Sequence, residues 1–110
     1  MSDDLHDWEF VCTEAELLPG EKKTVWHGDT PILVVNLEGD YYAVEDQCTH
    51  EDFELSAGPV DQDTGQIECV FHGAKFDLRT GAATCAPAYT PVATFPVKVL
   101  DGAIWTRDDR

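Results

Sequence analysis

Short segments rich in β-branched and aromatic residues recur along the chain, and clusters of turn residues separate them. Segments of about four to eight residues with this composition are typical of β-strands. The predicted strands are Trp8–Cys12, Lys22–His27, Ile32–Leu37, Tyr41–Glu45, Gln66–Val70, Ala74–Leu78, Phe95–Leu100 and Ala103–Thr106. We therefore expect an all-β fold of small antiparallel sheets.

Turn residues between these segments predict how the strands connect. Glu38-Gly39-Asp40 predicts a hairpin turn in which glycine supplies a positive-φ position, and Asp101-Gly102 predicts a second, tight hairpin. Thr13 and Glu16 flank a predicted single helical turn. The strands on either side of each of these two turns should therefore pair as a hairpin.

Two parts of the chain lack the strand pattern. Residues 46–65 show no clean alternation, and they predict a long ordered loop. Loops longer than about 12–15 residues in a compact domain are usually functional or disordered. The segment that contains Pro87, Pro91 and Pro96 is restricted to extended or turn structure.

Length and charge limit the classes of function. The chain has 110 residues, which predicts a single domain over 1–110, and a formal net charge of −15 at pH 7. This charge argues against partners such as nucleic acids or an anionic membrane surface. It favours a protein partner with a basic docking face, although acidity also serves solubility alone. Because Met1–Leu5 is polar and acidic, we expect no signal peptide and a cytoplasmic location.

Two short motifs combine a thiol with an imidazole. Cys48-Thr49-His50 lies at the start of the long loop, and Cys69-Val70-Phe71-His72 follows its end. A classical zinc finger groups two cysteines on one arm and two histidines on the other. Mixed arms suit a binuclear site, with two cysteines on one iron and two histidines on the other. Gly73 allows the backbone to approach such a cluster closely, since it has no Cβ.

Alternative interpretations remain open for several residues. A mononuclear zinc site would use the same four ligands. Cys12 is predicted to be a small buried side chain, and Cys85 a packing residue close to the site. His6 and His27 have no matching partner motif. The tryptophans and tyrosines are predicted to belong to strands and core, namely Trp8, Trp26, Trp105, Tyr41 and Tyr42.

The sequence resembles a known family at this point. Cys48-Thr49-His50, the segment from Cys69 to Asp77, Thr80-Gly81 and Pro87-Ala88 together resemble the bacterial Rieske [2Fe–2S] ferredoxins of multicomponent aromatic ring-hydroxylating dioxygenases, of carbazole or biphenyl type. The motif core spans about residues 40–90, and the strand spacing resembles the family over nearly the whole chain.

The resemblance implies a fold, a cofactor and a set of ligands. The fold would be the Rieske type, with a cluster-binding subdomain of about residues 46–88 built from two ligand loops and a proline-containing third loop. One [2Fe–2S] cluster would be bound. Cys48 and Cys69 would ligate its inner iron, and His50 and His72 the outer, solvent-near iron.

The resemblance also implies a function. The protein would carry single electrons from an NAD(P)H-dependent flavoprotein reductase to the terminal Rieske oxygenase of an aromatic hydrocarbon catabolic system, as a monomer and without catalysing hydroxylation itself. The other interpretations are a Rieske ferredoxin for another oxygenase or for Fe–S assembly, and a zinc-bound structural module. Phe53 and Phe71 are predicted docking residues, and Glu51, Asp52 and Glu54 predicted steering charges.

Departures from high-potential Rieske proteins indicate a low reduction potential. Those proteins have an additional cysteine in each ligand loop, where this chain has Phe53 and either Val70 or Phe71. They also direct hydroxyl groups from Ser and Tyr at the cluster sulfides, where this chain has Ala74 and Phe76. Fewer hydrogen bonds to the sulfides stabilise the reduced cluster less.

We therefore predict a midpoint potential of about −150 mV, near the lower end of the Rieske range. Protein-film voltammetry of the cluster-loaded protein measures it directly. A midpoint above zero would contradict the prediction.

Overall fold

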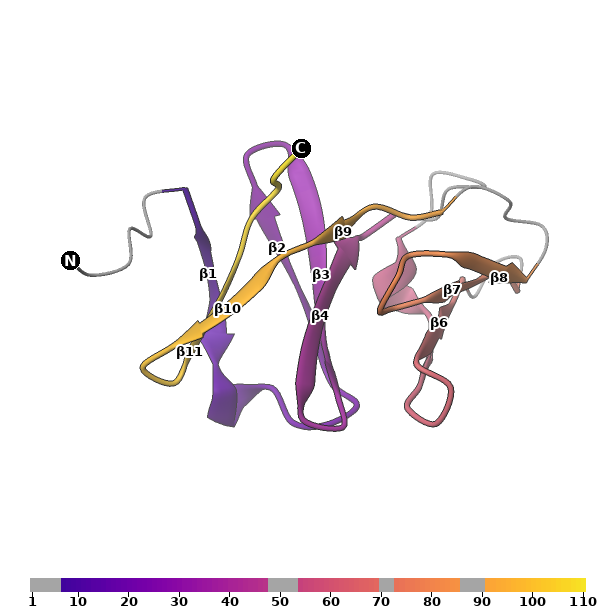
Figure 1. The fold of residues 1–110 in the computed structure, drawn as a ribbon, viewed down its shortest axis with the longest axis horizontal. Coiled ribbons are helices and arrows are strands. Elements are labelled where there is room, and N and C mark those ends of the chain that lie inside the picture. The colour runs from indigo at the N-terminus through magenta and orange to yellow at the C-terminus, as the bar shows by residue number, and fades with distance from the viewer. Residues whose placement is uncertain (1–6, 48–53, 70–72, 86–90) are drawn as a thin grey trace.

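Three small antiparallel sheets form the computed structural model, which describes residues 7–47, 54–69, 73–85 and 91–110 (Figure 1). The first sheet has the order β1 (Glu9–Thr13), β11 (Ala103–Thr106) and β10 (Val97–Leu100). The second has the order β2 (Lys22–His27), β3 (Thr30–Leu37), β4 (Asp40–Glu45) and β9 (Thr94–Phe95). The third has the order β5 (Val60–Asp61), β6 (Gln66–Glu68), β7 (Lys75–Asp77) and β8 (Ala83–Cys85).

The prediction of an all-β fold is confirmed. The helical elements in the described ranges are two 3₁₀ turns, η1 (Glu14–Glu16) and η2 (Leu55–Ala57). The first lies where a single helical turn was predicted, and the Glu16 carboxylate accepts hydrogen bonds from the Thr13 N–H and hydroxyl. No helix in the described part of the chain is long and apolar enough to cross a membrane.

β3 is buried on both faces and separates two hydrophobic cores. Successive side chains of a strand point to opposite faces. Leu33, Val35 and Leu37 belong to the core on the side of the third sheet, whereas Ile32 and Val34 belong to the core on the side of the first sheet. In Figure 1, β3 and β4 accordingly lie between β1 and β6–β8.

The predicted hairpins form with two-residue turns. Leu37 pairs with Asp40, so Asp40 is the first residue of β4 rather than a turn residue. Glu38 and Gly39 both have positive φ, at 54° and 101°. Positive φ at both central residues matches the right-handed twist of the flanking strands. The Asp101-Gly102 turn has the same form, with φ values of 52° and 77°.

The prediction of one continuous strand over Phe95–Leu100 is wrong. β9 pairs with β4 in the second sheet, and β10 pairs with β11 in the first sheet, so the chain changes sheets at Pro96. Proline has no N–H to donate to a ladder, which interrupts pairing at this residue. The Pro96 carbonyl instead accepts a hydrogen bond of 2.8 Å from the Thr106 hydroxyl.

Other differences concern very short elements. β5 and η2 lie inside the predicted loop over 46–65, and β8 was not predicted. β6 ends at Glu68, two residues before the predicted end at Val70, which itself lies outside the described residues. Trp26 lies in β2 as predicted, but it is 60% exposed and does not belong to the core.

Two residues singled out in the sequence have structural roles. Cys12 is buried, as predicted, and burial raises the pKa of its thiol. His27 accepts a hydrogen bond at Nδ1 from the Asp108 backbone N–H. The Asp108 carboxylate accepts further bonds from Arg110 and Thr30, which hold its pKa well below the usual range. The C-terminal segment is thereby attached to β2 and β3.

Asn36 is a buried amide that joins three segments. Its Nδ2 donates to the Leu17 carbonyl, and its Oδ1 accepts from the Gly39 N–H, both at 2.8 Å. We predict that Asn36→Ala lowers the free energy of unfolding by about 1–3 kcal/mol, because it leaves a buried carbonyl and a partly buried N–H without partners. Urea unfolding of the two proteins measures the difference.

Gln62→Ala is the matched control, because Gln62, between β5 and β6, contacts the turn of the same hairpin. Gln62 Oε1 accepts from the Glu38 N–H at 3.1 Å, at an exposed position where water replaces the lost acceptor. An equal loss of stability in both variants would contradict the role assigned to burial at Asn36.

Candidate metal centre

One of the four predicted ligands lies in the described part of the chain. Cys69 directly follows β6, and its side chain is fully buried. Cys48 and His50 lie in 48–53, and His72 lies in 70–72, both outside the described residues. The structure therefore shows how the chain enters and leaves the predicted ligand segments.

The second predicted ligand segment is closed by two backbone hydrogen bonds. The Cys69 N–H donates to the Ala74 carbonyl at 2.7 Å, and the Gly73 N–H donates to the Cys69 carbonyl at 2.8 Å. Gly73 has a φ of 74°, a conformation that side-chain-bearing residues rarely adopt. The backbone hydrogen bond from Gly73 to Cys69 therefore depends on glycine at position 73.

The first predicted ligand segment is closed by a side chain. Asp46 directly follows β4 and is 3% exposed. Its Oδ1 accepts a hydrogen bond of 2.7 Å from the backbone N–H of Ser56 in η2. This bond brings together the two ends of the segment that contains Cys48 and His50 in the sequence.

The predicted third loop begins and ends beside the same sheet. Lys75 pairs with both Glu68 and Cys85, so the residues next to Cys69 and the last residue of β8 share one end of the third sheet. The chain returns at Val92, whose N–H donates to the Gly81 carbonyl at 2.8 Å. Cys69 and the start of the third loop therefore lie at a common end.

Buried apolar side chains pack next to this end of the third sheet. Ala74 and Phe76 are fully buried in the core on the side of the third sheet, and neither has a hydroxyl group. The same core contains Leu55 and Ile67. An apolar environment with low solvent access lowers the local dielectric constant and influences the potential of a bound metal centre.

These features fit an iron–sulfur cluster. A thiolate ligand at Cys69 would be shielded from water, and glycine at position 73 places no Cβ there. Two thiolates and two imidazoles, divided between two arms, form the ligand set of a Rieske centre. The chain thus has the donor residues for such a group in its sequence, and Cys69 and Ala74 beside the second motif are buried.

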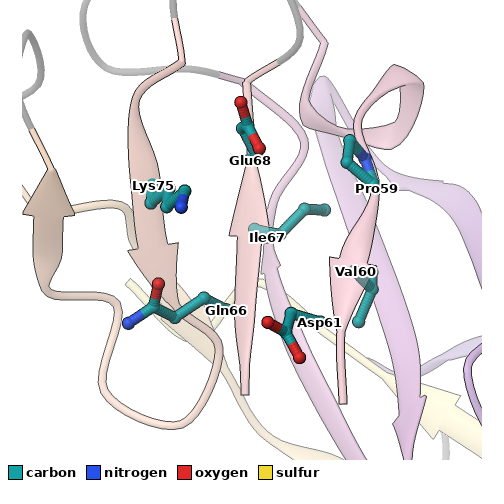
Figure 2. A pocket seen from close by; sticks show the side chains of 7 residues that line it. All are labelled: Pro59, Val60, Asp61, Gln66, Ile67, Glu68 and Lys75. Atoms are coloured by element: carbon teal, nitrogen blue, oxygen red, sulfur yellow. The ribbon is translucent and has the colours of Figure 1, made fainter. Parts of the chain in front are cut away.

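A shallow hollow on the third sheet was missed by the sequence analysis. It has a volume of about 240 Å³ and lies over β5, β6 and β7 (Figure 2). Asp61 and Glu68 contribute carboxylates to its lining, and Lys75 contributes an ammonium group. The other lining residues are Pro59, Val60, Gln66 and Ile67. A two-residue strand such as β5 has too short a pattern to predict this surface.

The remaining predicted site residues divide into two groups. Glu54, one of the predicted steering charges, is exposed and therefore accessible to a partner. The other predicted steering and docking residues lie outside the described ranges, namely Glu51, Asp52, Phe53 and Phe71. Cys85 is the last residue of β8, and its predicted packing role stays a prediction.

Comparison with known proteins agrees with this geometry. The family model described as the Rieske [2Fe-2S] domain matches residues 7–96. The chain is 43% identical over 89 residues to the ferredoxin component of biphenyl 2,3-dioxygenase from Rhodococcus jostii, which covers 81% of each chain.

Solved structures share the fold over nearly the full length. The ferredoxin of carbazole 1,9a-dioxygenase from Nocardioides aromaticivorans matches with a TM-score of 0.89 and 29% identity, over 93% of this chain and 98% of that one. A chain in a complex of reduced oxygenase and oxidized ferredoxin in carbazole 1,9a-dioxygenase matches with a TM-score of 0.87 and 34% identity, over 92% of this chain and 93% of that one.

The Gly73 turn provides a test of the site geometry. We predict that Gly73→Ala lowers the free energy of unfolding by about 1–2 kcal/mol through left-handed backbone strain. Among the described residues, a Cβ at this position would meet only the Glu68 carboxylate, at 3.8 Å, so the cost expected from them is conformational rather than steric. The variant should also lose the visible absorbance of its metal centre faster than the wild type.

Gly28→Ala is the control for strain alone. Gly28 has a φ of 62°, and a Cβ there would meet no atom within 4 Å. It should cost a similar free energy of unfolding but leave retention of the metal centre unchanged. Wild-type stability of Gly73→Ala would contradict the prediction.

Proposed function

Because the chain belongs to the Rieske [2Fe–2S] domain family, we propose that it is the ferredoxin of an aromatic ring-hydroxylating dioxygenase system, passing single electrons to the terminal oxygenase. The observation that supports this most directly is the close match to dioxygenase ferredoxins over nearly the full length of the chain. The protein is a component of the enzyme system and does not itself catalyse hydroxylation.

The solved complex supports the oxygenase as the electron acceptor. That structure contains a reduced oxygenase together with an oxidized ferredoxin, and the match covers 93% of the length of its matched chain. A flavoprotein reductase that oxidises NAD(P)H is the proposed electron donor. We propose that the ferredoxin works as a cytoplasmic monomer, because it has to present one end to two partners in turn.

We propose that four residues bind one [2Fe–2S] cluster. Cys48 and Cys69 would ligate the inner iron, and His50 and His72 the outer iron. The cluster, when bound, accepts and releases a single electron. The buried position of Cys69 and its backbone hydrogen bonds with Gly73 and Ala74 support the assignment of the inner iron to the thiolates.

The protein residues contribute position, shielding and charge. Apolar packing around Phe76 excludes water from the inner side of the site. We propose one domain over 1–110 with a cluster-binding subdomain of about 46–88, whose outer end faces the partners. Exposed acidic residues such as Glu54 would attract a basic docking face.

Reconstitution of electron transfer tests the function. The holo-protein should restore substrate oxidation when it is added to a flavoprotein reductase, NADH and the terminal oxygenase of a biphenyl or carbazole dioxygenase. The rate should fall about tenfold or more between low and high salt, since charge steering is screened. Oxygenase turnover and NADH consumption measure the transfer.

The His50→Cys and His72→Cys variants are the controls for the ligand set. Thiolate in place of imidazole should lower the reduction potential or prevent cluster assembly, because imidazole ligands raise the potential. A colourless wild-type protein with one zinc ion would overturn the cluster assignment. A red-brown holo-protein that supports no turnover with either oxygenase would overturn the proposed partner instead.

A further inference from the structure

Two described residues connect the predicted ligand segments to each other. Asp46 lies beside the first segment, and Gly58 contacts the strand that leads into the second. We propose that Asp46 and Gly58 are positioning residues that fix the two predicted ligand segments relative to each other. This inference rests on the ligand set proposed above.

The Asp46 carboxylate is buried and uses both of its oxygens. Oδ1 accepts from the Ser56 N–H, and Oδ2 accepts from the Thr24 hydroxyl, each at 2.7 Å. The Asp46 backbone N–H donates to the Pro31 carbonyl at 2.9 Å. Asp46 thereby joins β2, β3 and η2 at the point where the chain leaves β4.

The Asp46–Ser56 bond has a specific effect on the first arm. Residues 47–55 lie between its two partners, and this segment includes Cys48 and His50. Closing both ends of a segment reduces the conformations that its middle can adopt. The bond therefore limits where these two side chains can lie relative to β4.

Gly58 contacts the strand that leads into the second ligand segment. Gly58 is buried, and its N–H donates to the Leu55 carbonyl at 2.9 Å. A Cβ at Gly58 would collide with the carbonyl oxygen of Glu68, the residue before Cys69. The Glu68 N–H also donates to the Pro59 carbonyl at 3.1 Å. The backbone after η2 therefore packs directly on the end of β6.

We call the set Asp46, Ser56, Gly58 and Glu68 the strap. It begins two residues before Cys48 and ends one residue before Cys69. Both proposed thiolate ligands thus lie next to its ends. A displacement of η2 would move one arm relative to the other, and ligands from both arms have to reach one cluster.

The strap differs from simple core packing in what it should control. Loss of an ordinary core contact lowers overall stability and leaves a bound cluster with its normal electronic structure. Loss of the strap should alter ligand orientation, and the g-values of the reduced protein in electron paramagnetic resonance report this orientation. The rate of cluster loss to a chelator gives a second readout that does not depend on activity.

The experiment compares variants of the cluster-loaded protein. Asp46→Ala and Gly58→Ala should shift or broaden the g-values, and each should lose its cluster about 10–100-fold faster, as for residues that orient metal ligands. Asp46→Asn should retain wild-type behaviour. Its amide keeps an acceptor for Ser56 and donates to the Thr24 hydroxyl.

Ser56→Ala is the matched control. It keeps the backbone N–H that bonds to Asp46 and removes only a hydroxyl, whose contact with Glu54 is 3.4 Å long. It should match the wild type in g-values and in the rate of cluster loss. A change as large as that of Asp46→Ala would overturn the proposal.

Thr24→Val tests the strap if the stronger variants fail to fold. It removes one of the two bonds to the Asp46 carboxylate and keeps the bond from Ser56. It should accelerate cluster loss at unchanged secondary structure. Wild-type rates of cluster loss and wild-type g-values, either in Thr24→Val or in a folded Asp46→Ala, would overturn the proposed role of the strap but not the ligand set. A wild-type protein without a rhombic signal would overturn the ligand set, and the strap's role with it.

Discussion

The double burial of β3 is the constraint on which the rest of the structure depends. Side chains from Ile32 to Leu37 alternate between two cores, and β2 and β4 pair along the two edges of the strand. A shift of one residue in this register would exchange the two sets of side chains. The second sheet therefore has one arrangement in which both neighbouring sheets can pack on it. The Asn36 amide reinforces that arrangement through one buried and one partly buried hydrogen bond.

The position of the candidate metal centre depends on β3. Leu33, Val35 and Leu37 share a core with Ile67 and Phe76 of the third sheet. Near the start of β3, the Pro31 carbonyl accepts a hydrogen bond from the backbone N–H of Asp46, which leads into the first ligand segment. Apolar packing thus sets the position of the third sheet, and polar contacts set the point where the first ligand segment leaves β4. The family's chemistry requires both, since a cluster shared by two arms tolerates little relative movement.

The sequence predicts long and strongly patterned elements well, and elements of two or three residues poorly. β2 has the predicted bounds, because Lys22–His27 is rich in β-branched and aromatic residues between clear turn signals. β5 and β8 form through tertiary pairing with β6 and β7, and their own residues have too little pattern to indicate it. The paired motifs predict the ligand chemistry. The contacts of Asp46 with Ser56 and of Gly58 with Glu68 have no signal in the sequence, because they form only in the folded chain.

The chemical nature of the contacts between the two ligand segments determines which reactions can break these contacts. Thiol–disulfide exchange requires a sulfur–sulfur bond to attack, whereas Asp46 contacts Ser56 through a hydrogen bond and Gly58 contacts Glu68 by close packing. Glutathione and thioredoxin have no target in either contact. These contacts can therefore persist in a strongly reducing environment, and neither contact competes as an acceptor for the electrons that the protein transfers.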